Sequence, residues 1–393
     1  MQRVDLSHDI EDEMILDIID EVIIQKSHIL FLNIKIKNNL RREVFNSIRR
    51  LDILQELVED KEITEIMVNG VENIFIEKAG VISAWDKKFE SKEKLEDVVQ
   101  QIVSKSNRVI NESNPIVDVR LSDGSRVNVV LSPVAIEGPI VTIRKFPETE
   151  ITMEKLIELG SITPTIAEFL KKLVISKYNI FISGGTGSGK TTFLNALSNY
   201  IPPDERIITI EDSAELQIRN IPNLVRLEVR NANVEGNNAI SIRDLIKSSL
   251  RMRPDRIIVG EVRDAAAIDM LAALNTGHDG SLSTGHANSS IDMLCRLESL
   301  VLLGADIPLL AVRKQIASAL DIIVHLGRLR DKSRRVLEIA EVLDCVEGEI
   351  VVKPLFRFEE DDKDEKGKVI GTLKKTNHEL FNTLKLNRAG VKV

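Results

Sequence analysis

An apolar run, a glycine-rich turn and a helical run follow one another near residue 185, and this order limits the possible folds more than any other feature. Residues 179–183 read NIFIS, residues 184–191 read GGTGSGKT, and residues 192–200 read TFLNALSNY. The turn fits G-x-x-x-x-G-K-[ST], the pattern of a phosphate-binding loop, which requires a strand before it and a helix after it. A chance glycine turn before a helix is the plain alternative, and the complete order of strand, turn and helix argues against it. The sequence therefore predicts an α/β domain built around a phosphate-binding loop.

The residues of this loop have separate tasks in binding a nucleotide. The glycines let the backbone curl so that its N–H groups and the start of the helix face the phosphates. Lys190 reaches the β and γ oxygens and is a candidate catalytic residue, and the hydroxyl of Thr191 is a ligand for Mg²⁺. We therefore expect ATP and Mg²⁺ as the bound species. The expected nucleotide-binding residues are Gly184, Gly185, Thr186, Gly187, Ser188, Gly189, Lys190, Thr191 and Thr192.

The composition is that of a globular protein and disfavours a nucleic-acid-binding surface. The formal net charge is −8 and aromatic residues make up only 4%, whereas single-stranded nucleic acids bind to basic and aromatic surfaces. Cys295 and Cys345 are too few for a disulfide framework or a four-cysteine zinc motif, which favours a reducing compartment. Residues 1–20 lack the order of a secretion signal, and no apolar run approaches the ~20 residues that cross a bilayer. We expect membrane contact only through partners.

The N-terminal part of the chain predicts helices and a small sheet. Residues 1–38 show no clear period, and apolar residues at helical spacing then run from Val44 to Val58. Residues 63–77 predict a hairpin around an Asn-Gly turn, and a further helix follows Ser91, its candidate N-cap.

Three arginines occupy polar positions on strands of this small sheet. Residues 117–131 alternate apolar and polar side chains on both sides of a turn, and residues 140–146 follow as a third strand. The alternation places Arg120, Arg126 and Arg144 away from the core face. Taken alone, this is the pattern of solvated surface charge.

From residue 163 onward, helices alternate with short apolar strands. Thr163 and Pro164 predict a helix start with proline in the first turn. The predicted strands are residues 179–183, 207–210, 257–260 and 281–284. This alternation is typical of a parallel sheet covered by helices on both faces. The mixed charge run of residues 359–368 predicts an exposed loop.

Three further motifs accompany the phosphate-binding loop, and the four together resemble one family of motor proteins. Residues 210–215 read IEDSAE, residues 251–263 read RMRPDRIIVGEVR, and residues 276–288 read TGHDGSLSTGHAN. In this order they resemble the acidic box, the Walker B segment and the histidine box of the type II/type IV secretion ATPase superfamily, especially its tight-adherence (Flp-type) pilus assembly branch. The resemblance covers roughly residues 63–342.

The acidic box and the Walker B segment supply the expected catalytic carboxylates. Both follow apolar strands at the carboxyl edge of a sheet, where open α/β sheets bind ligands. The resemblance implies that Glu215 positions the attacking water, ahead of Glu211. Glu261 ends the strand where P-loop enzymes place a carboxylate near the magnesium ion, so Glu261 is expected to be catalytic and, with Thr191, to hold the metal.

The two histidines of the last motif are expected at the same edge of the sheet. A helix over residues 265–275 delivers His278 to the next turn, and the strand over residues 281–284 delivers His286. A lone histidine is usually structural. The resemblance implies instead that both sense the γ-phosphate, His286 as a catalytic residue and His278 as a nucleotide ligand. Metal binding is not expected, because no third ligand is spaced with them.

The resemblance also changes the expected role of the three arginines. In the family the N-terminal domain packs over the nucleotide and contributes arginines to the phosphates, and these arginines occupy the matching strands. We expect Arg126 and Arg144 to be catalytic and Arg120 to bind the nucleotide, although which of them touches the phosphates stays open. Arg263 fits an interface role equally well.

The implied fold class is α/β, with a RecA-like P-loop NTPase motor domain and a smaller α+β N-terminal domain. The expected boundaries are residues 1–60 for an N-terminal helical extension, 61–147 for the α+β domain, 148–161 for a linker, 162–350 for the RecA-like ATPase domain and 351–393 for a C-terminal extension.

The implied function is that of a hexameric ATPase motor whose domain motions power pilus assembly or protein secretion. We expect a homo-hexamer that is cytoplasmic, peripheral at the inner face of the cell membrane, and docked on an integral membrane platform protein. A RecA-like nucleic-acid helicase or translocase is the alternative, and the net charge of −8 disfavours it. The sequence leaves open whether such a machine extends or retracts a pilus or exports protein, and whether it is bacterial or archaeal.

Overall fold

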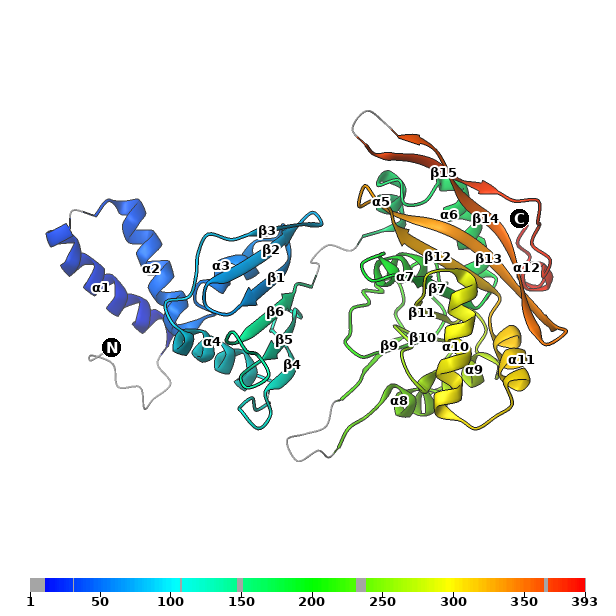
Figure 1. Cartoon of the computed structure of the whole chain (residues 1–393), viewed down its shortest axis with the longest axis horizontal. Coiled ribbons are helices and arrows are strands. Elements are labelled where there is room, and N and C mark those ends of the chain that lie inside the picture. The colour runs from blue at the N-terminus through cyan, green and yellow to red at the C-terminus, as the bar shows by residue number, and fades with distance from the viewer. Residues whose placement is uncertain are drawn as a thin grey trace. The chain divides into compact units, whose positions relative to one another are not determined.

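The computed structural model describes residues 11–30, 32–106, 108–146, 151–230, 238–363 and 367–392. The chain divides into two compact units, residues 1–149 and 150–393 (Figure 1). Residues 148–150 of the expected linker lie outside the described residues, and its later part contains a short helix, α5 (Met153–Glu158), which belongs to the core of the second unit. No helix in the described ranges is long and apolar enough to cross a membrane.

Two helices, α1 (Asp12–Leu30) and α2 (Ile34–Arg49), pack on each other at the start of the first unit through a small cluster of Ile15, Ile19 and Phe45. The helix predicted from Val44 to Val58 is interrupted. The backbone N–H groups of Arg50 and Asp52 both donate to the carbonyl of Asn46, and Asp52 adopts a φ of 51°. This left-handed residue ends α2, and a separate short helix, α3 (Leu54–Glu59), follows.

The rest of the first unit is an antiparallel sheet of six strands whose order is β3-β2-β1-β6-β5-β4. The strands are β1 (Ile63–Asn69), β2 (Asn73–Lys78), β3 (Val81–Ala84), β4 (Ile116–Arg120), β5 (Arg126–Val130) and β6 (Ile140–Arg144). Helix α4 (Lys92–Ser104) shares one apolar core with the sheet, and Ser91 caps it as predicted by accepting a hydrogen bond from the N–H of Lys94. In β4, β5 and β6, alternate side chains are therefore buried and the intervening ones lie on the other face.

The second unit is built on a sheet of nine strands in the order β15-β14-β13-β12-β7-β11-β10-β8-β9. The strands are β7 (Ile180–Gly184), β8 (Ile207–Glu211), β9 (Leu224–Glu228), β10 (Arg256–Val259), β11 (Leu282–His286), β12 (Ile322–Arg328), β13 (Arg334–Val346), β14 (Glu349–Lys363) and β15 (Val369–Lys375). Strands β12, β7, β11, β10, β8 and β9 pair in parallel, and β13 to β15 add antiparallel strands at one edge. The four strands predicted from the sequence are confirmed within one or two residues.

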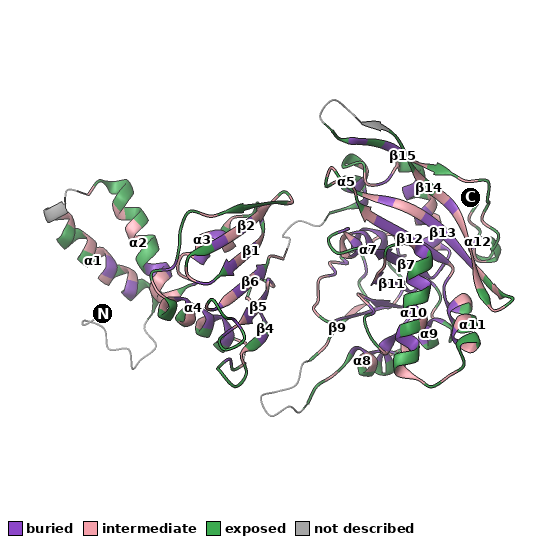
Figure 2. Ribbon diagram, in the orientation of Figure 1, coloured by how far each residue is buried: buried purple, intermediate pink, exposed green. Residues whose placement is uncertain are grey.

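Helices cover both faces of this sheet, as the alternating pattern predicts. Phe181 and Ile182 are neighbours on β7 yet belong to different apolar clusters, because successive strand side chains point to opposite faces. The buried central strands are seen in Figure 2. The helices are α6 (Pro164–Ile175), α7 (Lys190–Ser198), α8 (Ile242–Ser249), α9 (Ala266–Leu274), α10 (Ser290–Gly304), α11 (Leu309–Ala319) and α12 (Leu384–Ala389). Thr163 caps α6 and Pro164 stands in its first turn, as predicted.

The charged segment of residues 359–368 is not the loop that its composition predicts. Strand β14 continues to Lys363 and pairs with β15. On the neighbouring strand, Lys374 lies 3.0 Å from Glu359 and 3.3 Å from Asp361. The prediction was wrong because charges that face solvent on an edge hairpin read as a loop when their cross-strand partners are unknown. Residues 364–366 lie outside the described residues.

The segment after β15 is bound to the second unit by buried polar groups. The Glu341 carboxylate, 1% exposed, accepts hydrogen bonds from the backbone N–H groups of Phe381 (2.9 Å) and Asn382 (2.8 Å). Lys385 donates to Asp321 at 2.7 Å. This tail and the strands β14 and β15 are therefore part of the sheet domain. The sequence instead predicts that this domain ends at residue 350 and that residues 351–393 form a separate C-terminal extension.

Candidate functional site

The glycine-rich loop connects the carboxyl end of β7 to the start of α7, so the predicted context of strand, loop and helix is present. Gly187 and Gly189 have φ values of 71° and 93°, a region that residues with a Cβ rarely adopt. At Gly184 a Cβ would lie 2.5 Å from the carbonyl oxygen of Leu326 and 2.6 Å from Ser188 Oγ. Glycine is therefore required by backbone conformation at two positions and by close packing at a third.

Lys190 points back into the loop. Its Nζ donates to the carbonyl oxygens of Gly184 (3.1 Å) and Gly185 (2.9 Å) and lies 3.3 Å from Nδ1 of His286. The side chain is only 7% exposed, and burial lowers the pKa of its ammonium group. The lysine is thus held where the loop can present it to a bound phosphate.

His286 lies beside the loop because β11 pairs in parallel with β7 and places it opposite Gly184. Burial and the Lys190 charge lower the pKa of His286, which favours the neutral ring. Since the lysine ammonium has no lone pair, Nδ1 must accept from it, and the proton then stands on Nε2. Nε2 lies 3.1 Å from Oε1 of Glu261. These distances place His286 between the loop lysine and Glu261.

Glu261 follows β10 and links the histidine to Arg263, whose guanidinium donates to Glu261 Oε2 at 2.7 Å. Burial raises the pKa of Glu261, but this hydrogen bond and the charges of Arg263, His286 and Lys190 hold it below its usual range. The carboxylate is therefore ionised. Its Oε1 is buried and faces Nε2 of His286 at 3.1 Å.

An ionised carboxylate beside the loop lysine suits a magnesium ion. Thr191 is half-buried in the first turn of α7. Among the described residues, no three His, Cys, Asp or Glu side chains form a group that could hold a metal. Mg²⁺ typically takes one or two protein ligands and fills its remaining positions with water and phosphate oxygens. The two oxygen donors of Thr191 and Glu261 match this coordination preference.

The acidic box follows β8 and separates its two glutamates. Oε1 of Glu211 accepts from the backbone N–H groups of Glu215 (2.9 Å) and Leu216 (3.0 Å), and this side chain is 3% exposed. Glu215 is half-buried. The hydrogen bond to Glu261, and then the charges of Glu261, Asp212 and Glu215, raise the pKa of Arg263. The structure therefore brings the acidic box and the Walker B segment together around Arg263.

His278 does not reach the loop, and the prediction that both histidines meet at one edge of the sheet is wrong. Strand β11 starts at Leu282, after His278, and runs parallel to β7 toward the loop. His278 therefore lies at the opposite, amino end of the strand, where its Nδ1 is 3.1 Å from the carbonyl oxygen of Ala273. A strand of five residues separates its two ends by more than about 13 Å, too far for both to touch one phosphate.

The three arginines of the first unit form one row across β4, β5 and β6. Arg120 pairs with Arg126, and Arg126 pairs with Arg144, so all three side chains lie on the same face. The next strand, β1, places Glu65 opposite Arg144. The prediction that these arginines gather on a polar face is confirmed. Like charges in directly opposite positions repel, which makes the row a favourable place for an anion.

Two contacts of the loop were missed by the sequence analysis. Arg334 Nε donates to the carbonyl oxygen of Gly187 at 2.8 Å, and a Cβ at Gly187 would lie 4.0 Å from an Arg328 guanidinium nitrogen. Below the loop, Ser183 Oγ lies 2.8 Å from Nδ1 of the buried His325. The basic run of residues 328–335 was the available signal, but nothing local ties it to a loop more than a hundred residues earlier.

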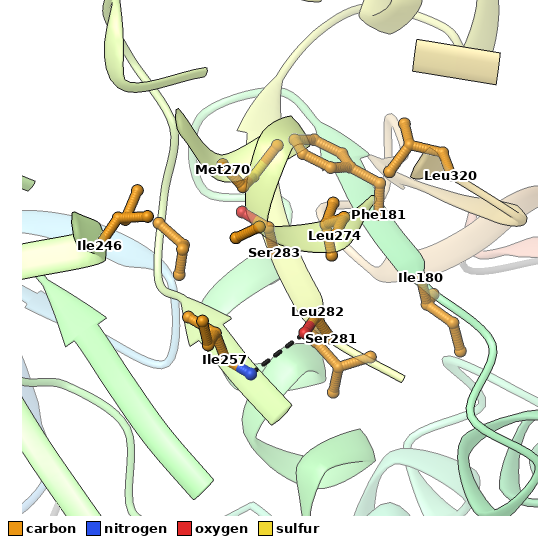
Figure 3. Close-up of a pocket in the computed structure, with 12 residues that line it drawn as sticks. Ile180, Phe181, Ile246, Ile257, Met270, Leu274, Ser281, Leu282, Ser283 and Leu320 are labelled. Atoms are coloured by element: carbon orange, nitrogen blue, oxygen red, sulfur yellow. Dashed lines mark hydrogen bonds between the residues drawn. The ribbon is translucent and has the colours of Figure 1, made fainter. Parts of the chain in front are cut away.

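A small apolar cavity lies elsewhere in the second unit. Apolar side chains such as Ile246, Met270 and Leu274 line it, and one polar group beside them, Ser281 Oγ, accepts from the N–H of Ile257 at 3.0 Å (Figure 3). Its lining includes neither the glycine-rich loop nor the acidic box, and neither His278 nor His286. It belongs to the core between the sheet and its helices.

Comparison with known proteins gives one consistent family. The model of the family described as type II/IV secretion system protein matches residues 48–369. A Mycobacterium tuberculosis protein named for conjugal transfer is 36% identical over 304 residues, which cover 76% of this chain and 86% of that protein. The type IV secretion system protein VirB11 of Bartonella quintana is 31% identical over 327 residues, which cover 72% of this chain and 89% of that protein.

A solved structure shares the fold. The pilus retraction motor PilT with bound ADP aligns with a TM-score of 0.52 at 19% identity, covering 86% of this chain and 87% of that one. The predicted fold class, an α/β RecA-like P-loop domain with a smaller α+β N-terminal domain, is confirmed.

Proposed function

Because the chain belongs to the type II/IV secretion system protein family, we propose that it is a hexameric motor that powers pilus assembly or protein secretion. The chain is an ATPase. The observation that carries the proposal is the group of Lys190, His286 and Glu261 around the glycine-rich loop. A nucleotide-gated scaffold without turnover would need Lys190 but not the ionised carboxylate of Glu261 beside it.

The residues of the loop divide the work of hydrolysis. Lys190 exchanges its carbonyl partners for phosphate oxygens, and the neutral His286 senses the γ-phosphate through Nε2–H. Thr191 and Glu261 would hold Mg²⁺, which when bound would supply positive charge to the phosphates. Glu215 orients the attacking water, because the other glutamate of the acidic box is already bound to backbone N–H groups.

The arginine row of the first unit, Arg120, Arg126 and Arg144, completes the site when ATP is bound. Three guanidinium groups on one sheet face can bind the charge that spreads over the γ-phosphate in the transition state. Nucleotide binding and release then drive motion between the two units.

The motor works in the cytoplasm at the inner face of the cell membrane and acts on an integral membrane platform protein. Relatives named for conjugal transfer and type IV secretion support a machine of this class. The narrower assignment to tight-adherence pilus assembly rests on the four sequence motifs alone.

The test of ATPase activity is hydrolysis by the purified chain with Mg²⁺, compared with Lys190→Ala. We expect the variant to lose hydrolysis and to bind ATP more weakly, because no other ammonium in the described loop bridges the β and γ oxygens. Lys314→Ala on α11, an exposed lysine, is the matched control and should keep the wild-type rate. Wild-type turnover by Lys190→Ala would falsify the assignment of the loop.

A further inference from the structure

Glu211 is a buried site residue that the chemistry above does not use. It is the last residue of β8, where the chain leaves the sheet to form the acidic box. Its Oε1 accepts from the N–H groups of Glu215 and Leu216, while Oε2 is buried with no hydrogen-bond partner among the described residues. Burial raises the pKa of this carboxyl group. Burying a carboxyl group with one oxygen unpaired destabilises the folded state, so the role of its contacts needs an explanation.

Gly260 leaves room for this side chain. A Cβ at Gly260 would lie 2.9 Å from Glu211 Cγ and 3.5 Å from its Oε1. Gly260 directly precedes Glu261, and its N–H donates to the carbonyl oxygen of Ile210 at 2.8 Å. The Glu211 side chain thus fills the space between the strand end that carries Glu261 and the turn that carries Glu215.

We propose that Glu211 is a positioning residue that sets the place of Glu215 by holding the backbone of residues 215 and 216. The proposal rests on the role of Glu215 in hydrolysis stated above. Two N–H groups bound to one oxygen fix the turn from the strand end to Glu215, and Gly260 keeps the Walker B strand out of the way.

The task needs an acceptor oxygen, not a negative charge. Burial disfavours the ionised form, and a neutral carboxyl oxygen accepts hydrogen bonds from backbone N–H groups as well. Glutamine offers a carbonyl oxygen at the same place. Methionine has a similar length and no such acceptor, so it leaves both N–H groups without their partner.

The experiment compares ATP hydrolysis by Glu211→Gln and Glu211→Met with wild type. We expect Glu211→Gln to stay within about threefold of the wild-type kcat. Glu211→Met should lose about 100-fold in kcat with KM nearly unchanged, the scale on which small displacements of a catalytic group act. Binding of a non-hydrolysable ATP analogue, measured directly, should be intact in both.

A second variant displaces the Glu211 side chain without replacing it. In Gly260→Ala the new methyl group meets Glu211 Cγ, so kcat should fall as in Glu211→Met. The double variant Gly260→Ala/Glu211→Met should be no worse than either single one, because both disturb one contact.

Several outcomes would overturn the proposal. It is wrong if Glu211→Met hydrolyses ATP at the wild-type rate, if Glu211→Gln is as impaired as Glu211→Met, or if Glu211→Met no longer binds the ATP analogue. A wild-type protein that does not hydrolyse ATP would instead contradict the proposed function, so the two failures are distinguishable.

Discussion

At the residue scale, the 3.3 Å between Lys190 Nζ and His286 Nδ1 links the charge of the loop lysine to the protonation of a histidine. A second proton on His286 would stand on Nδ1 and face the ammonium group. Burial and the charge of the lysine that is to bind phosphate therefore hold the ring neutral.

This link predicts how stability depends on pH. Burial and the Lys190 charge lower the pKa of His286 below its ordinary value of 6.5, so the unfolded chain takes up this proton more readily than the folded one. The contribution to the free energy of unfolding is fully present above pH 6.5 and is lost as the pH falls through the folded-state pKa. Denaturant titrations across this range should show that wild type loses more stability in acid than His286→Asn.

The comparison isolates one histidine, since the buried His325, whose pKa burial also lowers, is present in both proteins. His378→Asn, at an exposed position, serves as the control and should follow wild type. A stability difference between wild type and His286→Asn that does not change with pH would contradict the assignment of the neutral ring.

At the element scale, the pairing register of β4, β5 and β6 places the three arginines directly opposite one another on one face of the sheet. We expect Arg126→Ala and Arg144→Ala each to lower ATP turnover by about 100-fold or more while nucleotide binding stays largely intact, as for an arginine that stabilises the transition state. Arg42→Ala on the exposed side of α2 is the matched control. Steady-state hydrolysis and direct binding of an ATP analogue separate the two effects, and unchanged rates in both variants would return the row to solvated surface charge.

The same scale explains what the sequence could predict. Strands β7, β8, β10 and β11 were found because apolar runs end in loops that carry chemistry, and that pattern is local. The direction of a strand is not local. His278 and His286 stand in one motif, yet β11 separates them to opposite ends of the sheet. The hydrogen bond from Arg334 to Gly187 joins residues far apart in sequence, and the acceptor role of Glu211 is seen only when its side chain turns inward.

At the scale of the whole molecule, a motor needs more than one copy of the chain and something to push. In the proposed motor, movement passes from copy to copy through head-to-tail interfaces, and such interfaces form a ring when their rotation closes. We expect light scattering over a concentration series to show a hexamer that an ATP analogue favours.

Glu215→Gln, which should bind ATP and hydrolyse it at least ~100-fold more slowly, should co-purify from membranes with an integral membrane protein.

Lys314→Ala, with normal turnover, is the control for co-purification, since it should release the partner during its cycle. A chain that stays monomeric at every concentration would contradict the predicted hexameric ring. Recovery of nucleic acid without a membrane protein would favour a helicase instead.

The backbone N–H groups of Phe381 and Asn382 donate to the carboxylate of Glu341. Glu341 precedes Phe381 by forty residues and is therefore synthesised first. Until those later residues have been synthesised, Glu341 cannot leave water without losing its hydrogen-bond partners. A nascent chain therefore carries the whole glycine-rich loop, both carboxylate motifs and His286 before the sheet beneath them can pack fully. Strand β13 therefore reaches its final packing only once residues 381 and 382 are present to bind Glu341.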